Sequence, residues 1–242
     1  MPCYYRASTD NERGCGLMFA SGIWQHIGKW QRMKNMNVEK QNNHAIITYE
    51  YQLPGLEGEP IVTVKYTVWS DGTVGVKAEY PGVQGAPDLP LFGMEFTLKQ
   101  SQNVFKYYGL GPDENYIDRC DGAMFGIYDG DAKSNLTPYV YPTACGNRTQ
   151  VRWLEVGNDE GSIRFETEGN PFQFTVLPYN EIQIEEARHM EELPKPYYTF
   201  VKIMANQMGV GGDDSWGAPV HEEYRMPGHK PYITEFRITR GK

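Results

Sequence analysis

From residue 45 onward, apolar and polar residues alternate with a period of two, as strands with one face in a core do. The clearest case is residues 61–69, where the turn Ser70-Asp71-Gly72 and a return at 73–80 predict a β-hairpin. The same pattern recurs to the end of the chain. It predicts strands at 45–51, 61–69, 73–80, 91–99, 104–108, 151–156, 162–166, 172–177, 198–204, 222–225 and 232–239.

Two segments follow a helical period instead. Ile23, Ile27 and Trp30 fall on one face at helical spacing, so residues 23–30 predict a short amphipathic helix. Asn180 and Gln183 match a capping box, which predicts a second helix from residue 181 to about residue 192.

The remaining segments are rich in turn-forming residues. Residues 6–14 predict a loop, and residues 109–147 predict a long irregular region with an extended edge segment at 137–142. Strands therefore follow one another with few helices between them. We expect an all-β protein, a large antiparallel β-sandwich with one or two short helices, in a single domain over residues 1–242.

Composition and charge narrow the possible partners. Hydrophobic residues make up 40% of the 242 residues, enough to bury a core without disulfides or a metal. The net charge of −8 argues against nucleic acid and anionic membranes, which are bound through clustered Lys and Arg. There is no long apolar run, no export signal and no C-x-x-C among the four cysteines. We therefore expect free thiols and a cytoplasmic protein.

Most motifs that carry chemistry are missing. The sequence has no G-x-S-x-G, no H-E-x-x-H and no phosphate-binding loop. The five histidines have no ligand-like spacing, so no metal site is predicted. Glycoside hydrolysis needs two carboxyl groups roughly 5 to 10 Å apart, and neither Asp213-Asp214 nor Glu222-Glu223 identifies such a pair. We therefore name no catalytic residue.

The segment MGVGGDDSW at 208–216 reads neither as a strand nor as a helix. Its glycines permit unusual backbone angles and close approach of another surface, while its aspartates and serine can bond to the loop backbone. Trp216 would then present a flat apolar face suited to the C–H face of a sugar. The other interpretation is a tight turn whose tryptophan fills the core.

Four short motifs occur in the same order as in a known family. They are RASTDN at 6–11, YGLGPDENY at 108–116 followed by Asp118-Arg119, YVYP at 139–142 and the glycine loop at 208–216. With them, the chain resembles the C-terminal domain of the large β-galactosidases of glycoside hydrolase family 2. In some bacteria this region is a separate small subunit.

The resemblance implies a sandwich of the galactose-mutarotase type and a division of labour. The catalytic glutamates and the magnesium site of that family lie on a TIM-barrel domain, which this chain lacks, so no cofactor is expected here. The expected partners are that catalytic domain or large subunit and a β-galactoside such as lactose, within an oligomer. The family domain also begins some tens of residues before Met1, which implies an N-terminal truncation, an exposed sheet edge and reduced stability.

The resemblance also assigns roles to residues. Trp216 corresponds to the substrate platform. Asp10 and Asn11 form the motif that precedes a mobile active-site loop, and this loop begins at Gly14 and runs to about Ile23. This loop departs from the family pattern at residues 15–19, where CGLMF replaces a more polar run. The glycine loop would be supported by Gly211, Gly212, Asp213, Asp214 and Ser215.

Two other functions remain open. A free-standing carbohydrate-binding module would bind sugar measurably as an isolated chain, whereas the subunit would bind almost none until the barrel is present. An epimerase related to the mutarotases would need a histidine acid and a glutamate base across one pocket. No histidine here matches such a motif.

Overall fold

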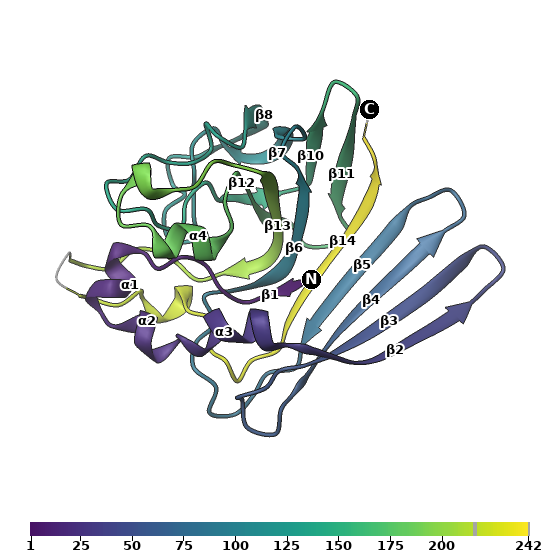
Figure 1. Cartoon of the computed structure of the whole chain (residues 1–242), viewed down its shortest axis with the longest axis horizontal. Helices are drawn as coiled ribbons and strands as arrows, with labels where there is room; N and C mark the ends of the chain where they lie inside the picture. Colours follow the sequence, from purple (N-terminus) through teal and green to yellow (C-terminus); the bar gives the residue numbers. More distant parts are fainter. Residues whose placement is uncertain (215–216, 242) are drawn as a thin grey trace.

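A computed structural model describes residues 1–214 and 217–241 as two antiparallel β-sheets with short helices at one end (Figure 1). One sheet has five strands in the order β1 (Pro2–Cys3), β6 (Leu91–Lys99), β13 (Tyr198–Gln207), β12 (Phe172–Leu177) and β9 (Arg148–Val151). The other has nine strands in the order β2 (Arg32–Lys40), β3 (His44–Gln52), β4 (Ile61–Trp69), β5 (Val74–Tyr80), β14 (Tyr232–Arg240), β11 (Gly161–Thr167), β10 (Trp153–Asn158), β7 (Val104–Gly111) and β8 (Met124–Asp131).

The core forms where the inner faces of the two sheets meet. Phe165 and Phe236 of the nine-stranded sheet pack against Phe96 of the five-stranded sheet, with ring centroids 5.3 and 6.0 Å away. Phe174 packs edge-on against Phe105 and Tyr107. Such contacts follow from the period-two pattern, because every second residue of each strand points inward. The predicted all-β sandwich is confirmed.

The helices are more numerous than the one or two predicted. The predicted helix at residues 23–30 is confirmed as α3 (Ile23–Trp30). The second predicted helix begins at the expected Asn180 cap but ends early, as α4 (Glu181–Glu186) with the 3₁₀ turn η1 (Met190–Glu192) beyond it. The predicted loop at 6–14 instead contains α1 (Asp10–Gly14), followed by α2 (Leu17–Ala20). Predicting residues 222–225 as a strand was wrong, because they form the 3₁₀ turn η2 (Glu222–Tyr224).

The pattern also missed strands. All nine residues of β2 are exposed, so this strand has no buried face that would produce a regular alternation. Within the region predicted to be irregular, β8 reads MFGIYDGD, and its two glycines hide the period. The predicted edge segment at 137–142 forms no strand.

The nine-stranded sheet extends beyond the sheet that faces it (Figure 1). Along one face, Met36 pairs with Tyr49, Tyr49 with Val64, and Val64 with Ala78. Ala78 and Val64 are fully buried, Tyr49 is half-buried and Met36 is 51% exposed. The inner apolar face of the sandwich therefore continues into solvent at β2 and β3. We call this surface, with Met33, Val38, Ile47 and Tyr51, the uncovered apolar face.

Two further findings concern the described residues as a whole. None of their helices has the length and apolar character that crossing a membrane requires. Each of the four cysteines is a free thiol, and burial raises the pKa of Cys145 to about 12.

Candidate functional site

The N-terminal segment lies along α4, far from it in sequence. The backbone N–H groups of Ala7 and Ser8 donate to the carboxylates of Glu181 and Glu185 respectively. The Tyr5 hydroxyl donates to Glu185 Oε2 at 2.9 Å. These contacts hold residues 5–8 in place, and so determine where α1 begins.

Arg6 joins this segment to the glycine loop. Its side chain is 1% exposed, and its Nη1 donates to the Met208 carbonyl at 2.5 Å. Its Nη2 donates to the Gly209 carbonyl and to Glu12 Oε1, both at 2.7 Å. Because a buried guanidinium requires an anion and hydrogen-bond acceptors, Arg6 holds both the loop backbone and the first turn of α1 in place.

α1 then places Asn11 and Gly14 against the two ends of the loop. Thr9 and Glu12 form a capping box that starts this short helix. Asn11 Nδ2 donates to the Val210 carbonyl at 3.2 Å. Gly14 lies beside Gly217, whose φ of +120° favours glycine. A Cβ on Gly217 would lie 2.9 Å from the Gly14 carbonyl oxygen.

Asp118 supports the glycine loop from the opposite side. Its Oδ2 accepts hydrogen bonds from the backbone N–H groups of Val210 at 2.8 Å and Gly211 at 2.6 Å. A Cβ on Gly209 would lie 2.5 Å from the same oxygen, so a side chain there would displace the carboxylate. Asp118 follows the second motif in the sequence, but its hydrogen bonds to the glycine loop were not predicted.

Glu114 links the second motif to the third. It accepts hydrogen bonds from the Gly146 N–H at 2.7 Å, the Tyr139 hydroxyl and Arg119 Nη2 at 2.6 Å. Burial alone would raise the pKa of Glu114, but hydrogen bonds from Tyr139, Gly146 and Thr137 outweigh it and hold the pKa below its usual value. The side chain is therefore an anion at neutral pH, and its hydrogen bonds hold Arg119, Tyr139 and Gly146 around one carboxylate.

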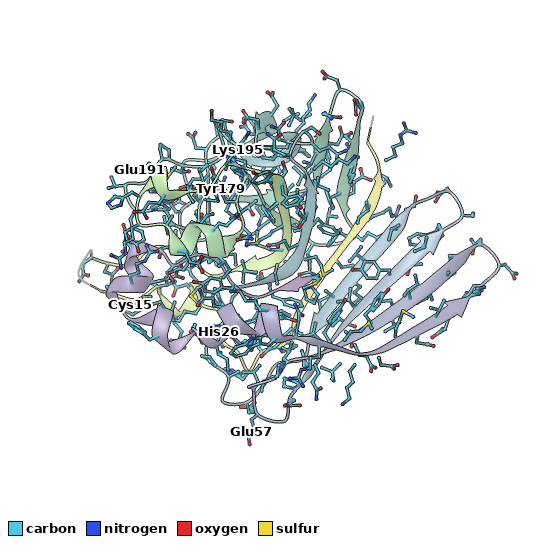
Figure 2. The ribbon with its side chains drawn as sticks, in the orientation of Figure 1. Cys15, His26, Glu57, Tyr179, Glu191 and Lys195 are labelled. Carbon is cyan, nitrogen blue, oxygen red and sulfur yellow. The ribbon has the colours of Figure 1, made fainter. Side chains whose placement is uncertain are left out.

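These contacts bring all four sequence motifs to one cleft of about 260 Å³. Asp10 and Asn11 line it from α1, Arg119 and Tyr139 from the second and third motifs, and Gly211 from the glycine loop. Cys15, at the end of α1, marks this end of the molecule in Figure 2, opposite the uncovered apolar face. We call this cleft, together with residues 208–214 of the loop, the candidate site.

Gly212, Asp213 and Asp214, which were expected to support the glycine loop, contact residues 218–221. Asp213 Oδ1 lies 2.7 Å from His221 Nε2, and this hydrogen bond raises the pKa of His221. Asp214 Oδ1 accepts from the Ala218 N–H at 3.1 Å. A Cβ on Gly212 would lie 2.4 Å from the Ala218 carbonyl oxygen, so a glycine is required by close approach. The predictions for Ser215 and Trp216 lie outside the described residues.

The cleft of the candidate site is lined by hydrogen-bonding side chains. Among residues 1–214 and 217–241, no cluster of three or more His, Cys, Asp or Glu side chains is placed to hold a metal ion. The cleft combines the carboxylate of Asp10, the amide of Asn11 and the guanidinium of Arg119 with a tyrosine ring. Such a set can orient a hydroxyl-rich ligand.

The family model described as "Beta galactosidase small chain" matches residues 1–238. The chain therefore belongs to the β-galactosidase small chain family. It is 40% identical to the β-galactosidase of Lactobacillus delbrueckii subsp. bulgaricus, over 94% of this chain and 22% of that protein. It is 30% identical to the β-galactosidase small subunit of Latilactobacillus sakei, over 98% of this chain and 84% of that protein.

The chain spans less than a quarter of the length of several other relatives, such as the β-galactosidase of Halalkalibacterium halodurans, to which it is 37% identical over 99% of this chain and 24% of that protein. Among solved structures it resembles an aldose 1-epimerase from Escherichia coli K12, with 12% identity and a TM-score of 0.41, over 86% of this chain and 68% of that one.

Proposed function

We propose that this chain completes the active site of a β-galactosidase that hydrolyses terminal β-D-galactosides such as lactose. The catalytic glutamates would lie on a separate catalytic domain or large subunit. The observation that carries this proposal is the convergence of four motifs, far apart in sequence, on one cleft beside the glycine loop. Membership of the small chain family supports it.

Within this site, Trp216 would be the platform for the non-galactose part of the substrate. The described residues on either side of it are hydrogen-bonded: Val210 and Gly211 donate to Asp118, and Ala218 donates to Asp214. A tryptophan on a fixed loop binds sugar without chemistry and positions the bond that the catalytic glutamates cleave. Asp10 and Asn11 would frame the same cleft.

The uncovered apolar face supports a protein partner. Monomeric proteins rarely expose a continuous apolar surface of this kind, and here it continues the core of the sandwich. The chain spans 22–24% of several β-galactosidases, so in those proteins about three quarters of the length lies outside the match. We propose that the rest of the enzyme covers this face, in a cytoplasmic oligomer, and that this chain itself holds no cofactor.

The proposal predicts that the isolated chain does not hydrolyse a β-galactoside. The test measures hydrolysis of a chromogenic β-galactoside by this chain, by a β-galactosidase large chain lacking the region, and by their mixture. We expect activity in the mixture alone. Activity of this chain by itself would contradict the division of labour, and an inactive mixture would favour a free-standing carbohydrate-binding module.

A tryptophan variant tests the site within the active mixture. Trp216→Leu should raise the KM for lactose severalfold, because it removes the surface on which the disaccharide rests. Trp30→Leu is the matched control, since Trp30 lies 57% exposed at the end of α3, away from the candidate site. An unchanged KM for lactose in Trp216→Leu would contradict the platform role.

A further inference from the structure

Strand β8 leaves one edge of the nine-stranded sheet open. It is the last strand in the sheet order and, among the described residues, pairs with β7 alone. The pairing runs from Met124 opposite Gly111 to Asp131 opposite Val104 without a register shift. A regular antiparallel edge presents alternate backbone N–H and C=O groups, which can pair with a further strand. The uncovered apolar face lies at the other end of the same sheet, at β2 and β3 (Figure 1).

An apolar cluster lies beside this open edge. Phe125 is 47% exposed and Ile127 is 60% exposed. Across the ladder, Ile127 is opposite Tyr108 and Phe125 is opposite Leu110. Because the buried Tyr107 points into the core, its neighbour Tyr108 points to the outer face of the sheet, and the residues paired on that face lie beside it. We call Tyr108, Leu110, Phe125 and Ile127 the β8 patch.

The aromatic rings at this patch are engaged with arginine and with each other. The guanidinium of Arg152 lies 5.6 Å from the centroid of the Phe125 ring, and the Tyr108 ring lies edge-on to Phe125 at 5.5 Å. Trp153, opposite Tyr108 in β10, has the guanidinium of Arg164 at 4.3 Å from its ring. Aromatic residues and arginine are enriched at protein–protein interfaces. The patch therefore suits a protein partner better than the stacking of a sugar on a free ring.

The charged residues of β8 lie outside the apolar half of the strand. Residues 123–127 read AMFGI and carry no charge. Asp129 is opposite Lys106 in β7. The Asp131 carboxylate accepts from the Ser134 N–H at 3.0 Å and from its hydroxyl at 2.7 Å, within its own turn. The apolar half of β8 can therefore meet another strand without burying an unpaired charge.

This half of the strand is complementary to itself. When two copies pair antiparallel about a two-fold axis at Gly126, Phe125 of each copy lies opposite Ile127 of the other. An aromatic residue opposite a β-branched one is among the favourable cross-strand pairs. In the same register Ala123 lies opposite Asp129, so no two like charges face each other. Each copy uses the same surface, as a closed two-fold dimer requires.

We propose that the open edge of β8 binds a second copy of this chain, through antiparallel pairing of residues 123–129 about Gly126. The two nine-stranded sheets then form one continuous sheet, and the two β8 patches meet on its outer face. The proposal does not rest on the function proposed above. None of the residues that line the candidate-site cleft lies on β8, and the uncovered apolar face is at the opposite edge, so the dimer leaves both surfaces free.

Sedimentation equilibrium of the 242-residue chain, from about 1 to about 100 μM, measures the dimer directly. We expect a reversible monomer–dimer equilibrium within this range. Each copy carries a net charge of −8, so added salt should screen the repulsion and tighten the dimer. Amide hydrogen exchange in β8 should slow as the protein concentration rises, because pairing protects N–H groups that an open edge leaves to water.

Two substitutions at Ile127 test the register. Ile127→Lys places a charge opposite the apolar Phe125 of the second copy and should raise the dissociation constant at least about tenfold. Ile127→Thr keeps the β-branched shape and should raise it about threefold or more. Because Ile127 is largely exposed, both variants should keep the urea midpoint of the wild type, measured on the monomer. Val38→Lys, at the exposed strand β2, is the control and should leave dimerisation unchanged.

The proposal is overturned if the chain stays monomeric up to about 100 μM, or if both Ile127 variants dimerise like the wild type. A dimer that Val38→Lys disrupts while Ile127→Lys does not would place the contact on the uncovered apolar face, and would also overturn it. The large chain takes no part in this experiment. A monomeric chain therefore leaves the complementation proposal standing, and an inactive mixture leaves the dimer standing.

Discussion

Replacing Arg6 should destabilise the protein strongly, because the guanidinium is buried against an anion. In Arg6→Met, the Glu12 carboxylate would lose its charge partner while 6% exposed, and the carbonyls of Met208 and Gly209 would lose their donors. Breaking a buried ion pair by removing one partner costs about 3–5 kcal/mol. A domain is stable by about 5–15 kcal/mol in total, so this single change would remove a large share.

Urea denaturation at neutral pH is the appropriate assay. We expect Arg6→Met to lower the midpoint by an amount that corresponds to at least about 3 kcal/mol, with the slope unchanged. Lys77→Met is the control, since the ion pair of Lys77 with Glu79 is over a third exposed and such pairs contribute about 0–1 kcal/mol.

A double variant separates the ion pair from lost packing. Glu12→Gln removes the buried charge while its amide oxygen can still accept from the Thr9 N–H. Arg6→Met combined with Glu12→Gln should therefore be more stable than the sum of the two single losses predicts, by at least about 1 kcal/mol. The reasoning is refuted if Arg6→Met costs no more than Lys77→Met, or if the two single losses simply add.

Three further predictions concern acid stability, the glycine loop and the partner surface. The folded-state pKa of Glu114 is lowered, so its contribution to the free energy of unfolding is fully present above its usual pKa and is lost as the pH falls through the lowered folded-state pKa. Glu114→Gln should therefore reduce the loss of stability between neutral and acid pH. Gly209→Ala should destabilise the fold and abolish complementation by displacing Asp118. Met36→Glu should change the stability of the isolated chain by less than about 0.5 kcal/mol, yet raise the large-chain concentration needed for complementation at least tenfold, the equivalent of about 1.4 kcal/mol.

Each of the three has a matched control. Glu160→Gln should retain the acid sensitivity of the wild type, measured by urea denaturation across pH. Gly28→Ala, inside α3 with open space around it, should be neutral or stabilising by up to about 1 kcal/mol. Asn37→Glu lies on the opposite face of β2 and should leave complementation unchanged, and equal effects of Met36→Glu and Asn37→Glu would contradict the partner surface.

Periodicity predicted the elements that have one buried face. Helix α3 was found from the helical spacing of Ile23, Ile27 and Trp30, and Ile27 is indeed buried, although Trp30 at the end of the helix is 57% exposed. Strand β2 was missed because neither face is buried within this chain. Helix α1 had a readable signal in Thr9 and Glu12, the two ends of a capping box, but five residues are too few for a helical period.

The candidate site could be predicted from the sequence only in part. The motif match assembled its residues in order, but no local pattern shows that Arg6 reaches Met208, or that Asp118 reaches Val210. Both contacts join segments more than ninety residues apart, and the position of each segment depends on sheet topology. The contacts of Glu114 could not be predicted, because its donors lie between 5 and 32 residues away in the sequence.

The exposed edge at β2 also bears on aggregation. A free strand edge presents unpaired N–H and C=O groups to any other strand, and edges of natural sheets carry charges and bulges that discourage such pairing. Strand β2 carries Lys34 and Glu39 among its exposed residues and has a register shift between Met33 and Asn35. This edge can therefore remain open without joining the edge of a second copy, while the neighbouring apolar face stays available.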